Sequence, residues 1–369
     1  MIKKFLKNLD YKLIIIVLVL ASIGCVALFS AASGEIHGSE FTKQLMWIGI
    51  GLVMMLITSM INYEVYQKCW PILYIISIVL LVGVLFMPPV NGATSWYNLG
   101  FMSFQPSELA KICVIISLAA VITKIRIKDE EGISKIKNLL LIFALVMVPI
   151  VLIILQPDYG TAMTFVVFTI VMLFISNIDK KYILFGALAI IVTLPLLYMF
   201  VLPQHAKDRI QVFLDPSIDP LGKGYNIIQS KIAIGSGQLT GMGLGEGNQT
   251  QLGYLYPKTT DFIFAVIAEE MGFIISSMVI IFSMWLLIRC IHISKTAKDN
   301  FASQLAIGIM GMFMFYIIQN IGMTMGLLPI TGVPLPFVSY GGSSMICNMI
   351  AIGILLNIAS RRDKIVLLG

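Results

Sequence analysis

The amino-acid sequence predicts an all-α integral membrane protein: a bundle of ten transmembrane helices with a long extracytoplasmic loop between the seventh and eighth. The composition is the first reason, because 58% of the 369 residues are hydrophobic and only 12% are charged. Soluble domains carry about 25% charged residues. Mean hydropathy is +0.94. The second reason is a series of ten apolar runs, most of them close to the ~20 residues that a membrane-spanning helix needs. Both observations exclude a soluble globular domain, a disordered chain and a disulfide-stapled secreted domain, and they favour a single polytopic domain over residues 1–369.

The ten apolar runs define the expected spans. They lie at residues 12–32, 41–61, 71–87, 105–124, 138–155, 160–176, 182–202, 262–290, 301–326 and 338–360. The first is too long for a secretory signal and is interpreted as a retained anchor. Residues 156–160 (Gln-Pro-Asp-Tyr-Gly) separate the fifth span from the sixth, because Pro and Gly end helices and an Asp at the bilayer centre is costly.

The basic residues orient these spans. Of the 25 Lys and Arg, 18 fall on the side that carries both termini and seven on the other. The positive-inside rule therefore predicts that both termini are cytoplasmic. The net charge of +6 is explained by this topology, so no nucleic-acid partner is expected.

Four segments on the predicted outer side are rich in Gly, Pro and polar residues. They are residues 88–108, the turn at 156–160, the long loop at about 203–261, and residues 328–344. Irregular backbone at membrane depth is tolerated only where protein buries it or water reaches it. We therefore expect these segments to surround a wet cavity that opens outward.

Three acidic positions on this side are candidates for chemistry. Asp261 opens the eighth span at its outer mouth, where partial burial and a helix N-terminus together suit a general base; a helix cap is the alternative, with Thr260 equally suited to it. Glu108 and Lys111 share one helix face, either as an incidental ion pair or as groups that point into the cavity. Asp158 is either an N-cap or a carboxylate at the cavity floor.

Other polar residues have weaker signals. Residues 224–234, which include Lys231, are compatible with an interfacial amphipathic helix whose basic side chains meet an anionic headgroup. Glu269 and Glu270 lie too far into the eighth span to cap it, so one of them is expected to bond across the bundle. The three histidines are far apart and the five cysteines form no CxxC pair, which disfavours a zinc site.

Four motifs occur in order along the chain. They are Gln-Pro-Ser-Glu at 105–108, Gln-Pro-Asp at 156–158, Asp-Phe-Ile-Phe-Ala at 261–265 followed by Glu269 and Glu270, and Pro-Leu-Pro-Phe at 334–337 followed by Ser-Tyr-Gly-Gly-Ser-Ser at 339–344. Together they resemble the SEDS family (shape, elongation, division and sporulation proteins). Gly-Tyr-Asn at 224–226 and Gln-Ser-Lys at 229–231 resemble its elongation branch more than its division branch, with the sporulation branch as the alternative. There is one departure. Where the family usually has Leu-Pro-Glu-x-His-Thr-Asp, residues 255–261 lack the Glu and the His.

The resemblance implies a peptidoglycan glycosyltransferase that serves cell elongation and shape. Such an enzyme polymerises lipid II into β-1,4 glycan strands on the outer face of the bacterial cytoplasmic membrane, with inversion at the anomeric carbon. Asp261 would be the general base. The leaving diphosphate would be stabilised by Lys111, Arg209 or Lys231, or by Mg²⁺ or Mn²⁺. The substrate-binding or cavity residues would include Glu108, Asp158, Thr260 and Ser339. The implied partner is a class B penicillin-binding protein, docked on the outer faces of the eighth and ninth spans.

Two other functions fit the same composition. A lipid II flippase would be favoured by inverted repeats, but only the two Gln-Pro motifs recur, 51 residues apart, and the polar groups cluster on one side. A non-catalytic scaffold for cell-wall enzymes would make Asp261 dispensable. The sequence therefore favours the enzyme.

Overall fold

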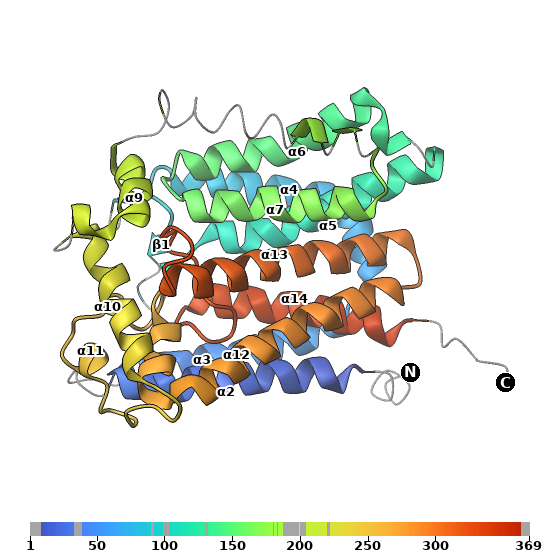
Figure 1. The fold of residues 1–369 in the computed structure, drawn as a ribbon. Helices are drawn as coiled ribbons and strands as arrows, with labels where there is room; N and C mark the ends of the chain where they lie inside the picture. Colours follow the sequence, from blue (N-terminus) through green and yellow to red (C-terminus); the bar gives the residue numbers. More distant parts are fainter. Residues whose placement is uncertain are drawn as a thin grey trace.

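A computed structural model gives the fold. It describes residues 9–32, 39–89, 92–98, 100, 103–129, 132–179, 181–182, 184–186, 199, 204–219 and 222–362. The long helices are α2 (Tyr11–Ala32), α3 (Ser39–Met60), α4 (Tyr63–Val84), α5 (Pro106–Lys128), α6 (Ile136–Ile154), α7 (Tyr159–Ile175), α12 (Ile263–Lys295), α13 (Asn300–Thr324) and α14 (Gly342–Ser360). They run along one common direction, and the start of α2 and the end of α14, which lead to the chain termini, lie at the same end of the bundle (Figure 1).

The long helices divide into inner and outer ones. Seven of those described are long and apolar enough to cross a membrane: α2, α3, α4, α6, α12, α13 and α14. In the most apolar stretch of α13, 83% of residues are buried, against 17% in α4. α5 is buried almost throughout and packs on α4, α13 and α14. The polar Glu108 and Lys111 of α5 are therefore enclosed by protein.

The spans predicted from the sequence agree with the described helices to within a few residues, with one exception. The third span was expected to begin at Pro71, but α4 begins at Tyr63, where the Asn62 side chain accepts a hydrogen bond from Glu64 N. Pro71 is accommodated inside the helix. The predicted seventh span, 182–202, falls mostly outside the described residues, so the count of ten remains a prediction.

The outer segments gather at the bundle end opposite the termini (Figure 1). The loop expected at about 203–261 contains α9 (Gln204–Leu214), the 3-10 turn η2 (Pro216–Ile218), α10 (Lys223–Ser236) and α11 (Asn248–Gln251). Another 3-10 turn, η1 (Gly132–Ser134), precedes α6. Strands β1 (Tyr97–Asn98) and β2 (Ser103–Phe104) pair antiparallel, with Tyr97 opposite Phe104. α10 is the helix expected at 224–234, and it packs on α12 and α13.

α12 is broken at Gly272, whose φ of 75° suits glycine. The backbone groups that the break frees are paired with residues 238–243. Glu269 O and Glu270 O accept from Met242 N and Gly243 N, while Phe273 N and Ile274 N donate to Gln238 O and Leu239 O. Every one of these groups is satisfied, which membrane depth demands. The break therefore anchors the outer loop to the bundle.

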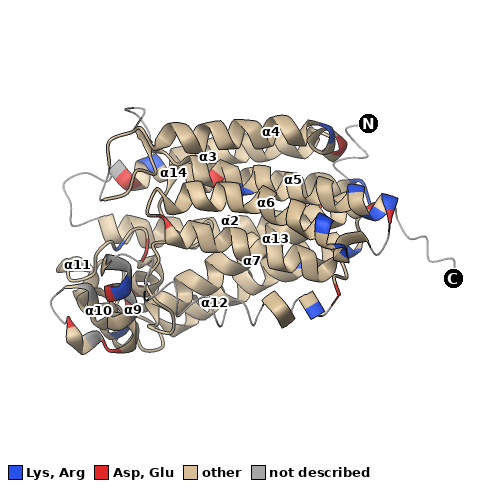
Figure 2. Ribbon diagram, turned by 90° about the horizontal axis from the view of Figure 1, so that it is seen from above, with Lys and Arg blue, Asp and Glu red and all other residues tan. Residues whose placement is uncertain are grey.

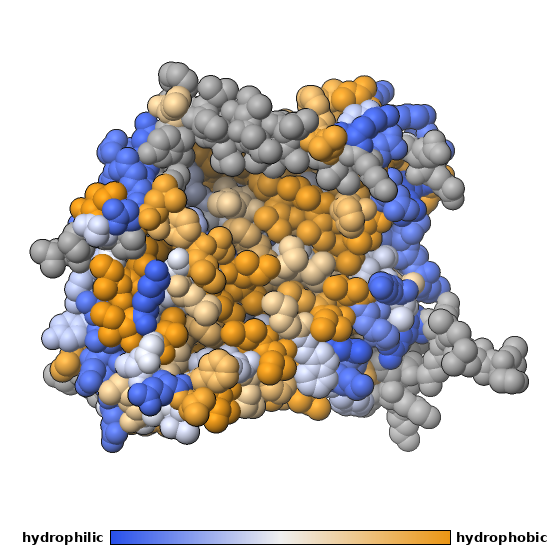
Figure 3. Space-filling model, viewed as in Figure 1, coloured by the Kyte–Doolittle hydropathy of each residue, from blue (hydrophilic) through white to orange (hydrophobic). Residues whose placement is uncertain are grey.

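The surface supports a membrane-spanning bundle. Charged residues gather at its two ends (Figure 2). On the face shown in Figure 3, hydrophobic residues form the broad middle band between two hydrophilic ends. Such a band exposes a row of large apolar side chains, such as Phe143 and Ile281 (60% and 63% exposed). Only a lipid-like environment makes that exposure favourable.

Candidate active site

Asp261 lies in the turn that precedes α12, and the backbone of this turn is fixed by hydrogen bonds. Thr259 O accepts from Tyr340 N (3.0 Å). Thr260 O accepts from the Ser339 hydroxyl (2.7 Å), and that hydroxyl also accepts from Leu335 N (2.8 Å). Ser339 is thus a brace between two loops, and Thr260 takes part through its carbonyl oxygen.

Asn320 adds a second support from α13. Its amide nitrogen donates to Asp261 O (3.1 Å) and to Val333 O (2.8 Å). The side chain is fully buried. Gly332 lies beside the carboxylate: a Cβ at this position would be 3.6 Å from Asp261 Oδ2. The turn that carries Asp261 is therefore held from two elements, α13 and the loop before α14. The partly exposed side chain of Asp261 faces that loop.

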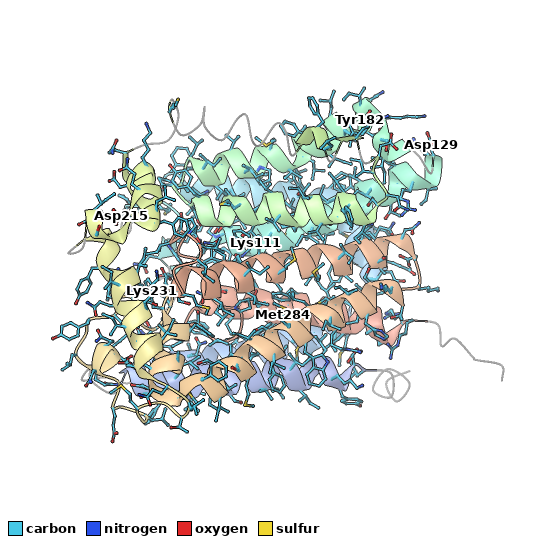
Figure 4. The ribbon with its side chains drawn as sticks, in the orientation of Figure 1. Lys111, Asp129, Tyr182, Asp215, Lys231 and Met284 are labelled. Atoms are coloured by element: carbon cyan, nitrogen blue, oxygen red, sulfur yellow. The ribbon has the colours of Figure 1, made fainter. Side chains whose placement is uncertain are left out.

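Glu108 and Lys111 form a buried ion pair. Lys111 Nζ lies 2.8 Å from Glu108 Oε1, with side-chain exposures of 0% and 2%. The Tyr316 hydroxyl donates to the same oxygen (3.1 Å), and Lys111 Nζ lies 4.0 Å from the centroid of the Tyr316 ring. Figure 4 shows Lys111 inside the bundle. The structure therefore gives both residues a fixed internal partner, and Lys111 is not positioned as a free cation.

Asp158 is the N-cap of α7. Its Oδ1 accepts from Thr161 N (3.1 Å). This bond agrees with the N-cap, which was one of the two interpretations of Asp158 from the sequence. Its Oδ2 accepts from the Gln105 side-chain amide (2.9 Å), which joins the two Gln-Pro motifs. Burial is the main influence on this carboxyl and raises its pKa, although the bonds to Thr161 and the charge of Lys111 oppose the effect.

The start of α7 connects this group to Asp261. A Cβ on Gly160 would come within 2.6 Å of Thr331 O, so the loop before α14 packs directly on the first turn of α7. Thr331 adjoins Gly332, which borders Asp261. The structure thus brings Asp261, Thr260, Ser339, Asp158, Glu108 and Lys111 to one end of the bundle. The open cavity expected between them remains a prediction.

The two loop cations considered for the leaving diphosphate, Lys231 and Arg209, lie on separate helices, α10 and α9. Lys231 is exposed on α10, where Figure 4 shows it near the outer end of α13. A Cβ on Gly326 would be 2.7 Å from Lys231 Nζ, and the preceding Ser230 hydroxyl donates to Thr324 O (2.7 Å). Lys231 is therefore held against the loop that leads to Gly332. Arg209 lies in α9, but its side chain is outside the described residues.

Glu269 and Glu270 hold the outer loop in place. Glu269 Oε1 accepts from Gln249 N (2.7 Å), and its Oε2 accepts from Thr250 N (3.0 Å) and the Thr250 hydroxyl (2.6 Å). Glu270 Oε1 accepts from the Gln251 amide (2.8 Å). The bond expected across the bundle is therefore not the one observed, because the side-chain hydrogen bonds of both residues are made to α11 of the outer loop. Glu269 thus accepts hydrogen bonds from backbone N–H groups of this short helix and caps it.

Among the described residues, no three His, Cys, Asp or Glu side chains lie close enough together to hold a metal ion by themselves. Mg²⁺ is often held by one or two carboxylates together with substrate phosphates. Asp261 beside a diphosphate substrate fits that pattern. The cofactor remains a prediction.

A family model described as cell cycle protein, FtsW/RodA/SpoVE, matches residues 11–364. This chain belongs to that family. The SEDS resemblance inferred from the motifs is therefore confirmed, and the chain is a multi-pass membrane protein of a bacterial family.

SEDS relatives cover nearly the whole chain. The peptidoglycan glycosyltransferase MrdB of Escherichia coli K12 is 38% identical over 359 residues, which is 97% of this chain and 95% of MrdB. A solved chain of a peptidoglycan synthase complex, described as coordinating polymerization and crosslinking, has a TM-score of 0.81 at 29% identity, with 96% and 99% covered. The rod shape determining protein RodA of Thermus thermophilus gives a TM-score of 0.71 at 26% identity, with 96% and 97% covered.

Two residues of this SEDS site, Asn320 and Tyr316, were missed by the sequence analysis, which identified Gln105 only as part of a motif. Asn320 carries a usable signal, because Gln319 and Asn320 are adjacent polar residues inside an apolar span, and intramembrane polar residues mark function or packing. Tyr316 has no such signal, and the sequence does not indicate the bond from Gln105 to Asp158. Their partners lie 208 and 53 residues away in the chain.

Proposed function

We propose that this protein polymerises lipid II into β-1,4 glycan strands on the outer face of the cytoplasmic membrane, with both termini in the cytoplasm. The observation that supports this most strongly is the position of Asp261. Its carbonyl oxygen accepts from Asn320, Ser339 braces the preceding Thr260, and its carboxylate borders Gly332. Membership of a family with named glycosyltransferases gives the reaction class.

The reaction proposed is a single inverting displacement. The 4-hydroxyl oxygen of the acceptor N-acetylglucosamine attacks the anomeric carbon of the donor. An Asp261 oxygen takes the hydroxyl proton, and the polyprenyl diphosphate leaves with the electron pair of the broken bond. A positioned general base contributes typically 10²–10⁴-fold to the rate. A fixed backbone supports this role, because misplacement by about 1 Å can cost 10²-fold.

The leaving diphosphate needs a positive partner. Lys111 is buried and paired with Glu108, so we assign this role to Lys231, which is exposed at the outer end, and to Arg209. A bound Mg²⁺ or Mn²⁺ would neutralise part of the diphosphate charge. Asp158, Glu108 and Lys111 then shape the floor of the site rather than touch the reacting atoms.

The proposed partner is a class B penicillin-binding protein that cross-links the new strands. Its support is the likeness to a chain from a complex that coordinates polymerization and crosslinking. Of the two spans expected to form the docking face, α13 is mostly buried. α12 exposes Phe273, Ile274 and Ile281. We therefore place the partner against α12.

The test is polymerisation of purified lipid II by the detergent-solubilised protein, with and without the partner, and with Mg²⁺, Mn²⁺ or chelator. The proposal predicts glycan strands. If no condition yields strands but the protein moves lipid II across liposome membranes, the flippase is correct. If neither activity is found, the scaffold is correct.

A further inference from the structure

A groove lies between α4 and α6 in the half of the bundle that carries the termini. Its volume is about 380 Å³, and it is lined on one wall by Trp70, Pro71 and Tyr74 and on the other by Leu141, Ala144 and Leu145. Most of these side chains are exposed or partly exposed on the surface of the bundle. The groove is thus an apolar channel in the part of the surface that faces lipid.

A hydrogen bond between the two helices holds the groove together. The Tyr74 hydroxyl donates to Leu145 O (2.9 Å), so one side chain crosses from α4 to α6. Leu145 O is available because Pro149, four residues further along α6, has no N–H to give it. This hydrogen bond therefore satisfies the carbonyl oxygen that Pro149 leaves without an N–H donor, and it fixes the spacing of α4 and α6 at this depth.

Two lysines flank the groove at its end nearest the termini. Lys68 precedes Pro71 by three residues, and Lys137 precedes Leu141 by four, so each lies on the groove face of its helix, one turn closer to the helix start. α4 and α6 run in the same direction (Figure 1). Relative to the link between Tyr74 and Leu145, the lysines lie about 9 and 12 Å back along their helices at 1.5 Å per residue.

Neither lysine has a protein partner among the described residues. Both are exposed, and neither takes part in the ion pairs found in this part of the chain. Two aromatic residues, Tyr66 and Trp70, lie at the same level and are partly exposed. Trp and Tyr collect where headgroups meet acyl chains. The two ammonium groups are therefore at headgroup depth, directly above an apolar channel.

We propose that this groove binds an anionic phospholipid of the bilayer, with its phosphate between Lys68 and Lys137 and one acyl chain along Tyr74 and Ala144. Basic pockets between membrane helices bind anionic headgroups in this way. A zwitterionic lipid has an ammonium of its own, which cancels the attraction. None of the groove residues is among those assigned to the proposed reaction, and Asp261 lies at the opposite end of the bundle from the two lysines, so the lipid site is independent of that reaction.

Native mass spectrometry of the full chain in detergent tests the headgroup. The probes are phosphatidylglycerol and phosphatidylcholine with identical acyl chains. One lysine near a membrane surface contributes roughly fivefold to anionic lipid binding, so Lys68→Gln/Lys137→Gln should lose about 25-fold of the preference for phosphatidylglycerol. The control pair Lys295→Gln/Lys298→Gln removes the same charge from exposed positions at the same bundle end and should keep the preference.

Fluorescence quenching tests the position of the chain. Phosphatidylglycerol brominated on one acyl chain should quench the native protein, and Trp70→Phe should remove that quenching component. Ala144→Phe, which fills the channel, should weaken it. The proposal is wrong if both lysine pairs lower the preference equally, if Trp70→Phe leaves quenching unchanged, or if undecaprenyl phosphate displaces phosphatidylglycerol at equal concentration.

Discussion

The buried pair of Glu108 and Lys111 allows a quantitative prediction. The charged atoms are 2.8 Å apart and the side chains almost unexposed, so their attraction is about 6 kcal/mol at an effective dielectric constant of 20. Desolvation offsets most of this, but removing one partner leaves an uncompensated buried charge and costs about 3–5 kcal/mol. Lys111→Met should therefore destabilise the fold by that amount. Glu108→Gln should cost less, because the Tyr316 ring still lies against Lys111.

The double variant Glu108→Gln/Lys111→Met tests the reasoning. Because it leaves no unpaired charge, its cost should fall below the sum of the single costs by at least about 2 kcal/mol, within the range known for contacting residues. The assay is equilibrium unfolding in SDS mixed micelles, followed by tryptophan fluorescence. Lys181 and Asp179 form a matched exposed pair at 2.9 Å, and Lys181→Met should leave the midpoint unchanged. Additive costs at positions 108 and 111 would refute the account.

Three further predictions concern the backbone around the site. Asn320→Leu removes the donor to Asp261 O and should lower the polymerisation rate about 10–100-fold, since the base loses its position, with the thermal unfolding midpoint changed by only a few degrees. Asp158→Asn should raise stability at neutral pH, because burial raises the pKa of this carboxyl and ionising it costs stability as the pH rises through the raised value. The gain should disappear as the pH falls to the ordinary value of 3.8. Gly160→Val should prevent folding, because its Cβ would meet Thr331 O; Gly186→Val, where a Cβ meets nothing, is the control in size-exclusion chromatography.

Each of these three predictions would be contradicted by a specific result. Full activity of Asn320→Leu would show that the loop before α14 does not need this brace. A stability gain for Asp158→Asn that is independent of pH would place its origin in packing rather than in ionisation. A monodisperse Gly160→Val protein would mean that α7 and the loop separate easily.

The sequence predicted most helices because apolar run length is a local property. Runs of about 20 apolar residues need lipid or protein around them wherever they occur, and α5 begins at Pro106, within one residue of the expected start at 105. The third span was expected to begin at residue 71, but α4 begins at Tyr63 and contains Pro71. A proline is tolerated inside a membrane helix when neighbours satisfy the freed carbonyl.

Most residues of the site were predicted from the sequence, but the hydrogen bonds between them were not. Asp261 and Asp158 were identified from their positions at helix starts, which is again a local signal. The roles of Ser339 and Asn320 depend on partners 79 and 59 residues away. Hydrogen bonds of that kind are set by how the spans pack against one another, and a single amino-acid sequence does not record that packing.

The most direct test of the central claim compares Asp261→Asn with Asp215→Asn in lipid II polymerisation. Asp215 is an exposed acid in the same outer loop that caps η2 through Ser217 N, and Asn can keep that cap. The account predicts that Asp261→Asn, folded as judged by its unfolding midpoint, loses at least about 100-fold in rate, while Asp215→Asn polymerises like the native protein. Equal rates for the two variants would contradict Asp261 as the general base.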